Sequence, residues 1–330
     1  MRIGLIGAGR IGTNHAGILS GLSAIDSLLI ADVVYGRAGD VASRFDNAEA
    51  ADVDSVLDRV DAVVIASSTD THAELLRAAA ACGIPAFCEK PIALDLESTR
   101  SAVSAVEAAG IIVQMGFQRR YDPAMRAIRD RIAAGELGTP YLVRSQTHDP
   151  APPPLDYIPV SGGIFKDCLI HDIDIVRYVT GQEVVSVTAS GAVVTNHAIG
   201  GLGDFDTATA SFEMTGGTLA QLSGLRHDPV GYDVRLEVFG SIDSVAAGWS
   251  SRTPIHSAEP GATQTIDPII SFWDRFDAAY RAEMEAFVRV VNGEEAPASG
   301  VTDAYEDLKI AVACDLSALE GRAVHLAEIK

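Results

Sequence analysis

The chain has 330 residues, of which 48% are hydrophobic and 21% charged. This composition is ordinary for a globular protein, excludes wholesale disorder, and at this length predicts two domains or one large one. The formal charge of −20 argues against nucleic acid and anionic membranes as partners, because both bind basic patches.

The cysteines and the apolar runs indicate the cellular compartment of the protein. Cys82, Cys88, Cys168 and Cys314 form no C-x-x-C pair and have no histidine cluster at zinc spacing, so neither a metal site nor a disulfide framework is expected. No apolar run is long enough to span a bilayer, and the first strand follows Met1 and Arg2 with no signal-peptide layout. We therefore expect a cytoplasmic protein with free thiols.

The first part of the chain alternates short apolar runs with amphipathic stretches. Strands are expected at residues 3–6, 27–34, 62–66, 86–88 and 111–115, and helices after Gly7 and at 71–82, 94–109 and 123–134. Strands separated by helices imply βαβ crossovers and hence a parallel sheet. We expect a doubly wound Rossmann domain over residues 1–120, in an α/β protein.

The pattern then changes to strands in succession. After a strand at 141–146, a Pro-rich loop at 149–154 and a helix at 164–179, strands are expected at 184–194, 207–213, 217–225, 233–239 and 243–248. Such a series is typical of an antiparallel sheet. We expect an α+β domain over residues 121–330, with a large, open, mainly antiparallel sheet. Two closing helices follow at 272–291 and 302–320, and the last is expected to pack back on the Rossmann domain.

A glycine motif lies where the first strand meets the first helix. Gly7, Gly9 and Gly12 fit G-x-G-x-x-G, with Arg10 and Ile11 between them. Gly7 permits a tight turn, Gly9 lets the backbone approach a pyrophosphate, and Gly12 allows the helix to pack closely on the strand. The helix N-terminus offers free N–H donors to an anion. A lone match is weak, but its place in a βαβ unit predicts a dinucleotide site.

Other polar residues follow the strands of the same domain. Asp32 stands about 20 residues beyond the glycines, where an acidic residue binds the ribose hydroxyls of NAD; the alternative is that it caps a turn. The residues directly after Asp32, at 33–35, supply no cation for the 2′-phosphate of NADP, and the nearest candidate is Arg37. NAD is therefore expected. Ser67, Ser68, Thr69 and His72 follow a later strand and are candidate cofactor contacts, although Thr69 or Asp70 could simply cap a helix.

Two further places could carry chemistry. Lys90 follows a strand at the edge where the nicotinamide is expected, although a lysine is more often a solvated surface charge. Asp167 and His171 are four apart on the helix expected at 164–179, so both would project from one face. A carboxylate that orients an imidazole can take a proton from an alcohol. The alternative is a helix-terminal Asp beside a core His.

These segments resemble the Gfo/Idh/MocA oxidoreductase family, and within it the inositol dehydrogenases. The resemblance covers nearly the whole chain. It is carried by GLIGAGRIGTNHA (4–16), TDTHAELLRAAA (69–80), CEKPIAL (88–94), GFQRRYDP (116–123), DPAPPPLDYIPVSGGIFKDCLIHDIDIVRYV (149–179) and GYDVRLEVFGS (231–241).

The resemblance implies a dehydrogenase that uses NAD and acts on a ring hydroxyl of a polyol. Lys90 would polarise the hydroxyl, His171 would remove its proton, and Asp167 would bind a neighbouring hydroxyl. Glu89 and Gln118 would contact the cofactor, and Pro91 would follow a cis peptide. The remaining expected substrate contacts are Arg119, Thr147, Asp149 and Tyr232. A homo-oligomer, a dimer or tetramer formed through the open sheet, is also implied.

The chain departs from the family pattern at several positions. Gln118 stands where Met is expected, and Thr147-His148-Asp149 differs from the version with His and Asn in some relatives. Pro229-Val230 precedes Gly231 where an aromatic residue often stands. These positions are expected to line the polyol pocket, so they leave open a related sugar or aminocyclitol dehydrogenase. A catalytically silent NAD(H) sensor is a third reading, which the joint presence of Lys90, Asp167 and His171 disfavours.

Overall fold

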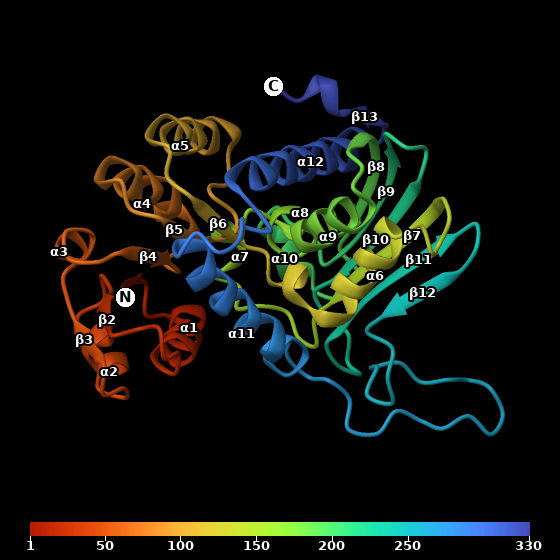
Figure 1. The fold of residues 1–330 in the computed structure, drawn as a ribbon. Coiled ribbons are helices and arrows are strands. Elements are labelled where there is room, and N and C mark those ends of the chain that lie inside the picture. The colour runs from red at the N-terminus through yellow and green to blue at the C-terminus, as the bar shows by residue number, and fades with distance from the viewer. The chain divides into compact units, whose positions relative to one another are not determined.

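The computed structural model describes residues 1–330, and internal contacts divide the chain into two compact units (Figure 1). The first unit comprises Met1–Gln118 and Ala278–Glu306, and the second comprises Arg119–Asp277 and Asp307–Lys330. The polypeptide therefore passes between the units three times. No helix combines the length and apolar character that crossing a membrane requires.

The first unit is built on a parallel sheet of six strands in the order β3-β2-β1-β4-β5-β6. The strands are β1 (Arg2–Ile6), β2 (Ser27–Ala31), β3 (Ala48–Ala50), β4 (Ala62–Ile65), β5 (Ala86–Glu89) and β6 (Val113–Gly116). The order reverses between β1 and β4, whose last residues, Ile6 and Ile65, lie in register. Open α/β sheets bind ligands beside such a reversal. The expected Rossmann fold is confirmed.

Helices connect these strands. They are α1 (Arg10–Ser20), α2 (Arg37–Ala42), α3 (Val53–Leu57), α4 (Thr69–Cys82) and α5 (Leu96–Ala109). The elements α2, β3 and α3 were not expected from the sequence, and the three residues of β3 include no β-branched or aromatic side chain. Strand β2 is shorter than expected, since the carboxylate of Asp32 accepts the N–H of Val34 at 2.7 Å and turns the chain.

The second unit contains a mixed sheet of seven strands in the order β12-β11-β7-β10-β9-β8-β13. The strands are β7 (Pro140–His148), β8 (Val184–Ala192), β9 (Thr207–Met214), β10 (Leu219–Leu225), β11 (Asp233–Gly240), β12 (Ser244–Ala247) and β13 (Val324–His325). β7 and β10 pair in parallel and the other neighbours antiparallel. The expected large, mainly antiparallel sheet is confirmed.

Helices pack on one face of this sheet: α9 contacts β7 and β10, and α8 contacts β9 (Figure 1). The remaining helical segments of the chain are α6 (Pro123–Ala133), α7 (Ile158–Ser161), α8 (Ile164–Asp167), α9 (Ile170–Thr180), α10 (His197–Gly201), α11 (Phe272–Val291), α12 (Val301–Glu320) and the 3₁₀ turns η1 (Gln118–Tyr121) and η2 (Leu326–Glu328). The opposite face of the sheet is largely polar: its exposed side chains include Thr209, Ser211 and Gln221, although Leu219 is exposed there too.

The helix expected at 164–179 is two helices in the structure. The N–H of Leu169 bonds to the carbonyl of Ile164, five residues back, so the hydrogen-bond ladder slips by one residue between α8 and α9. Asp167 is the last residue of α8 and His171 the second of α9. The expected single helix carrying both residues is therefore wrong.

The helix expected at 272–291 is confirmed as α11, but it is broken at Phe276, whose φ is −124°. The break lies beside one of the passages between the units, which falls between Asp277 and Ala278. From Asp307 onward α12 belongs to the second unit, where Lys166 of α8 pairs with Asp315 at 3.1 Å.

Candidate active site

The glycine loop has the geometry that a dinucleotide requires. Gly7 has a φ of +103°, and a Cβ there would lie 2.5 Å from the carbonyl of Ala66, so only glycine fits. A Cβ on Gly12 would overlap the carbonyl oxygen of Gly7, whereas a Cβ on Gly9 would meet nothing within 4 Å. Gly9 caps α1 without a side-chain hydrogen bond, so the first N–H groups of the helix remain available to an anion.

Asp32 lies next to this loop. One carboxylate oxygen accepts the N–H of Ala8 at 2.8 Å, the other accepts that of Val34, and the side chain is 5% exposed. Arg37 lies 3.4 Å from the carboxylate. The Arg37 guanidinium makes long contacts, of 3.4 and 3.5 Å, to the two oxygens, and ribose hydroxyls would replace these when a dinucleotide binds. The residues of the first unit therefore fit an NAD-type dinucleotide. Arg37 is the cation next to Asp32, as expected from the sequence.

The segment after β4 is held by its own hydrogen bonds. Ser68, rather than Thr69 or Asp70, is the N-cap residue of α4, and it makes no side-chain cap bond. The hydroxyl groups of Ser67 and Thr71 lie 2.6 Å apart. His72 is only 2% exposed, and its ring nitrogens face the carbonyl oxygens of Pro91 and Ser67. Its side chain thus contacts backbone rather than an open cofactor groove.

The segment after β5 contains the candidate lysine. The Lys90–Pro91 peptide is cis, as the family resemblance implies. The carboxylate of Glu89 lies 2.7 Å from Nε2 of His15, which is fully buried on α1, and Gly116 leaves room for the second carboxylate oxygen. His15 was missed in the sequence because it is 74 residues from Glu89. Gln118, the other expected cofactor contact, is buried at the end of the same unit.

In the second unit, Asp167 has partners that the sequence did not suggest. It accepts hydrogen bonds from the hydroxyl of Tyr157 at 3.0 Å and from Arg226 at 3.1 Å. Arg226 is 1% exposed and also donates to Asp204 at 2.8 Å. The only sequence signal for Arg226 is a cation directly after a buried strand. Its guanidinium thus pairs with two carboxylates at a buried position.

Asp149 adds a further carboxylate to this group. The thiol of Cys168 lies 3.6 Å from Asp149 and 3.9 Å from Asp167, so both acids approach one sulfur atom. Burial raises the pKa of Asp149 to about 6, and the charge of Asp167 contributes to the rise. Perturbed carboxyls of this kind are typical of functional sites, although structural networks produce them too.

A second buried network surrounds the first turn of α9. Arg119 donates to Asp172 at 3.0 Å and to Thr147 at 2.5 Å, while Thr147 and Ser145 both donate to Asp172. Asp172 follows His171 directly, so the network fixes the turn that carries His171 to strand β7. Arg119 and Thr147, expected at the substrate, are thus engaged with the protein, and only Nε of Arg119 is buried without a hydrogen-bond partner.

The remaining expected residues of this unit are His171 and Tyr232. His171 is partly buried. Tyr232 packs edge-on against the rings of Phe272 and Phe276, and burial raises the pKa of its hydroxyl. The structure therefore gathers the expected residues in two groups, one in each unit. The contacts that organise the second group involve partners distant in the sequence.

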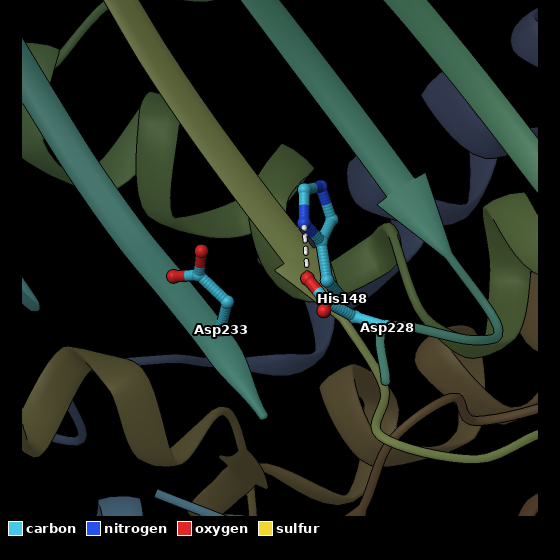
Figure 2. Close-up of side chains that lie close together, drawn as sticks. All are labelled: His148, Asp228 and Asp233. Atoms are coloured by element: carbon cyan, nitrogen blue, oxygen red, sulfur yellow. Dashed lines mark ion pairs between the residues drawn. The ribbon is translucent and has the colours of Figure 1, made fainter. Parts of the chain in front are cut away.

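A different cluster lies on the open face of the sheet. Figure 2 shows His148 at the end of β7, with Asp228 and Asp233 near it and the His148–Asp228 ion pair, 3.6 Å long, as a dashed line. The three could offer ligands to a metal ion. However, Arg235 already holds both oxygens of Asp233 at 2.9 Å, and Gln146 donates to one of them. A cation would have to compete with that guanidinium, so the cluster fits a metal ion poorly.

Comparison with known proteins identifies both parts of the chain. Residues 1–117 match the family model described as oxidoreductase family, NAD-binding Rossmann fold, and residues 125–246 match the GFO/IDH/MocA C-terminal domain. A myo-inositol dehydrogenase of Streptomyces leeuwenhoekii is 38% identical over 97% of this chain and 98% of its own length.

Solved structures give the same result. A putative myo-inositol dehydrogenase from Sinorhizobium meliloti superposes with a TM-score of 0.92 at 37% identity, over 99% of each chain. A myo-inositol dehydrogenase from Lactobacillus casei, in complex with NAD(H) and myo-inositol, superposes with a TM-score of 0.85 at 26% identity, over 98% of this chain and 96% of the other.

Proposed function

The chain belongs to the Gfo/Idh/MocA oxidoreductase family, and from this premise we propose that it oxidises a ring hydroxyl of inositol, converting myo-inositol to 2-keto-myo-inositol. The observation that carries the proposal is the match over almost the whole chain to a relative named as a myo-inositol dehydrogenase. A family member with that name was also crystallised with NAD(H) and myo-inositol.

In this proposal the first unit binds the cofactor, and NAD⁺ supplies the hydride acceptor when it is bound. The N–H groups at the start of α1 receive the pyrophosphate, and Gly9 leaves the space for it. Asp32 accepts hydrogen bonds from the ribose hydroxyls. Its negative charge disfavours the 2′-phosphate of NADP⁺, so NAD⁺ is the preferred cofactor.

The proton is handled by side chains from both groups of residues. Lys90 donates a hydrogen bond to the oxygen of the reacting hydroxyl, which stabilises the negative charge that develops there. His171 accepts the hydroxyl proton as general base. Asp167, whose own position Tyr157 and Arg226 fix, binds a neighbouring hydroxyl and orients the ring.

An aminocyclitol is the second candidate substrate. One observation favours it: Asp149 and Asp167 both approach Cys168, and Arg226 is the cation bonded to this group. An ammonium group on the ring would complement two neighbouring carboxylates better than a hydroxyl does.

A panel of substrates tests both readings. The protein is incubated with NAD⁺ or NADP⁺ and with myo-inositol, scyllo-inositol, an aminocyclitol or glucose, and NADH or NADPH is followed by absorbance. Turnover of myo-inositol with NAD⁺ supports the proposal, and a higher kcat/KM for the aminocyclitol would favour the second candidate. Binding of NADH without turnover of any substrate would favour the NAD(H) sensor.

We also propose that the enzyme is a homo-oligomer, a dimer or tetramer formed through the open face of the seven-stranded sheet. Helices leave this face uncovered, and its exposed Ser, Thr and Gln side chains would make the interface largely hydrogen-bonded. A monomer in light scattering at micromolar concentration would contradict this. A cytoplasmic location is supported by the four cysteines, all of which are free thiols.

A further inference from the structure

His72 is a buried imidazole whose two nitrogens both face carbonyl oxygens of the first unit. Nδ1 lies 2.8 Å from the carbonyl oxygen of Pro91, and Nε2 lies 3.1 Å from that of Ser67. Pro91 directly follows Lys90, and Ser67 begins the loop after β4. The ring therefore lies between two segments that are separate in the sequence, and each of them carries residues of the proposed site.

The carbonyl oxygens of Pro91 and Ser67 have no ready replacement for the imidazole as a hydrogen-bond donor. His72 is 2% exposed, so water does not readily replace the ring. A buried carbonyl that loses its donor costs as much as the desolvation of that group, and the segment that carries it tends to move toward a new partner. The position of both backbone segments thus depends on the imidazole.

The other end of the lysine segment is held independently. Glu89, on the opposite side of Lys90, bonds to buried His15 at 2.7 Å. The backbone around Lys90 is therefore fixed before it by His15 and after it by His72. Of these two imidazoles, His72 alone also contacts the loop after β4.

We propose that His72 is a positioning residue that couples the lysine segment to the loop after β4, so that Lys90 and the cofactor loop keep one relative placement. Because both ring nitrogens face backbone carbonyls, its role is to hold these two segments rather than to contact the cofactor or the substrate. The inference rests on the proposed function of Lys90 as the group that polarises the substrate. It reassigns His72 from the direct cofactor contact expected from the sequence to a backbone link.

The protonation state decides how the link works. A neutral imidazole donates from one nitrogen only, whereas the imidazolium donates from both. Burial lowers the pKa of His72, while the two carbonyls and Glu89 act in the other direction and Lys90 lowers it further. Both contacts, of 2.8 and 3.1 Å, are within hydrogen-bond distance, and only the imidazolium bonds both carbonyls at once.

Two amide substitutions separate the halves of the link. The amide nitrogen of Asn lies near the place of Nδ1 and that of Gln near the place of Nε2, so each retains one donor. His72→Asn keeps the bond to Pro91 and should leave kcat within about twofold while raising the KM for NAD⁺. His72→Gln keeps the contact to Ser67 and should lower kcat about tenfold, the effect of one lost buried hydrogen bond, with little change in the KM for NAD⁺. His72→Leu should show both defects.

The matched control is Leu76→Ala, one helical turn further on the same face of α4. Leu76 is fully buried, so its truncation lowers the thermal midpoint without touching either carbonyl. If Leu76→Ala, assayed below its midpoint, reproduced the kinetic defects, His72 would have a merely structural role. Equal defects in the Asn and Gln variants would also overturn the coupling.

One measurement is independent of turnover. NADH fluorescence on binding should show a raised Kd for His72→Asn and His72→Leu but not for His72→Gln. If the wild-type protein binds NADH yet turns over no cyclitol, the proposed function fails. The NADH affinities of the variants still test the contact between His72 and Ser67. Wild-type affinity for NADH in all three variants would refute the contact to Ser67 as part of the cofactor site.

Discussion

The two units build their candidate sites by different means. In the first, the geometry belongs to the backbone: Gly7 and Gly12 leave no room for a Cβ, the start of α1 is uncapped, and carbonyl oxygens receive His72. In the second, it belongs to buried side-chain charges, of which Asp167 with Arg226 and Asp172 with Arg119 are the main pairs. Apart from Lys90, which is proposed to contact the reacting hydroxyl, replacing a side chain should therefore affect the second site more than the first.

The largest effect is expected at His171. His171→Ala should lower turnover about 10²- to 10⁴-fold, the usual contribution of a positioned general base, and should leave the Kd for NADH almost unchanged. Stopped-flow and fluorescence titration measure the two. Lys90→Ala should be similarly impaired. Normal turnover of His171→Ala beside an inactive Lys90→Ala would make Lys90 the base.

The second-largest effect is expected at Arg226. Arg226→Met leaves the buried carboxylates of Asp167 and Asp204 without their cation and should cost roughly 3–5 kcal/mol of unfolding free energy. Urea denaturation measures it. The control, Arg131→Met, removes two surface ion pairs, to Glu136 and Asp243, and should cost far less. Equal costs would erase the contrast between buried and surface charge.

Asp149 should give a smaller and pH-dependent effect. Its folded pKa of about 6 is above the unfolded value near 3.9, so the folded state holds the proton more tightly. Its contribution to stability is complete below about pH 4 and is lost as the pH rises to about 6, by at most about 3 kcal/mol. Asp149→Asn should remove this decline from denaturation curves measured between pH 4 and 7.

The same variant identifies the group behind the pH–rate profile. A neutral His171 is needed for proton transfer, so activity should rise with pH around the ordinary histidine pKa of about 6.5. A rise that persists in Asp149→Asn belongs to His171. A rise that disappears belongs to Asp149.

The smallest effect is expected in the first unit. Asp32→Ala frees Arg37 from its carboxylate, so the preference for NAD⁺ over NADP⁺ should fall about tenfold, the equivalent of one charge-assisted hydrogen bond. The double variant Asp32→Ala with Arg37→Ala should lose the gain with NADP⁺. Ratios of kcat/KM for the two cofactors measure both. An unchanged preference in Asp32→Ala would mean that backbone geometry alone selects the cofactor.

The sequence separation between interacting residues explains which features could be predicted from the sequence. The glycine loop was predictable because its contacts fall within one strand–turn–helix unit. Strand β3 was missed because its alanines and glutamate resemble a loop, and the break between α8 and α9 was missed because the apolar period continues through Cys168 and Leu169. The partnership of Asp167 with Arg226 spans 59 residues, and no local pattern indicates it.

The interleaving of the units has a consequence for dividing the gene. Residues 1–118 end just after the edge strand β6, whose Met115 exchanges hydrogen bonds with Ser299, and Gln114 donates to the carbonyl of Glu283. A protein truncated after residue 118 would expose that edge, and exposed edge strands recruit other chains. The first unit is therefore encoded by two separate segments of the gene. Expressed alone, it should stay soluble only if residues 278–306 are joined to residues 1–118 by a linker.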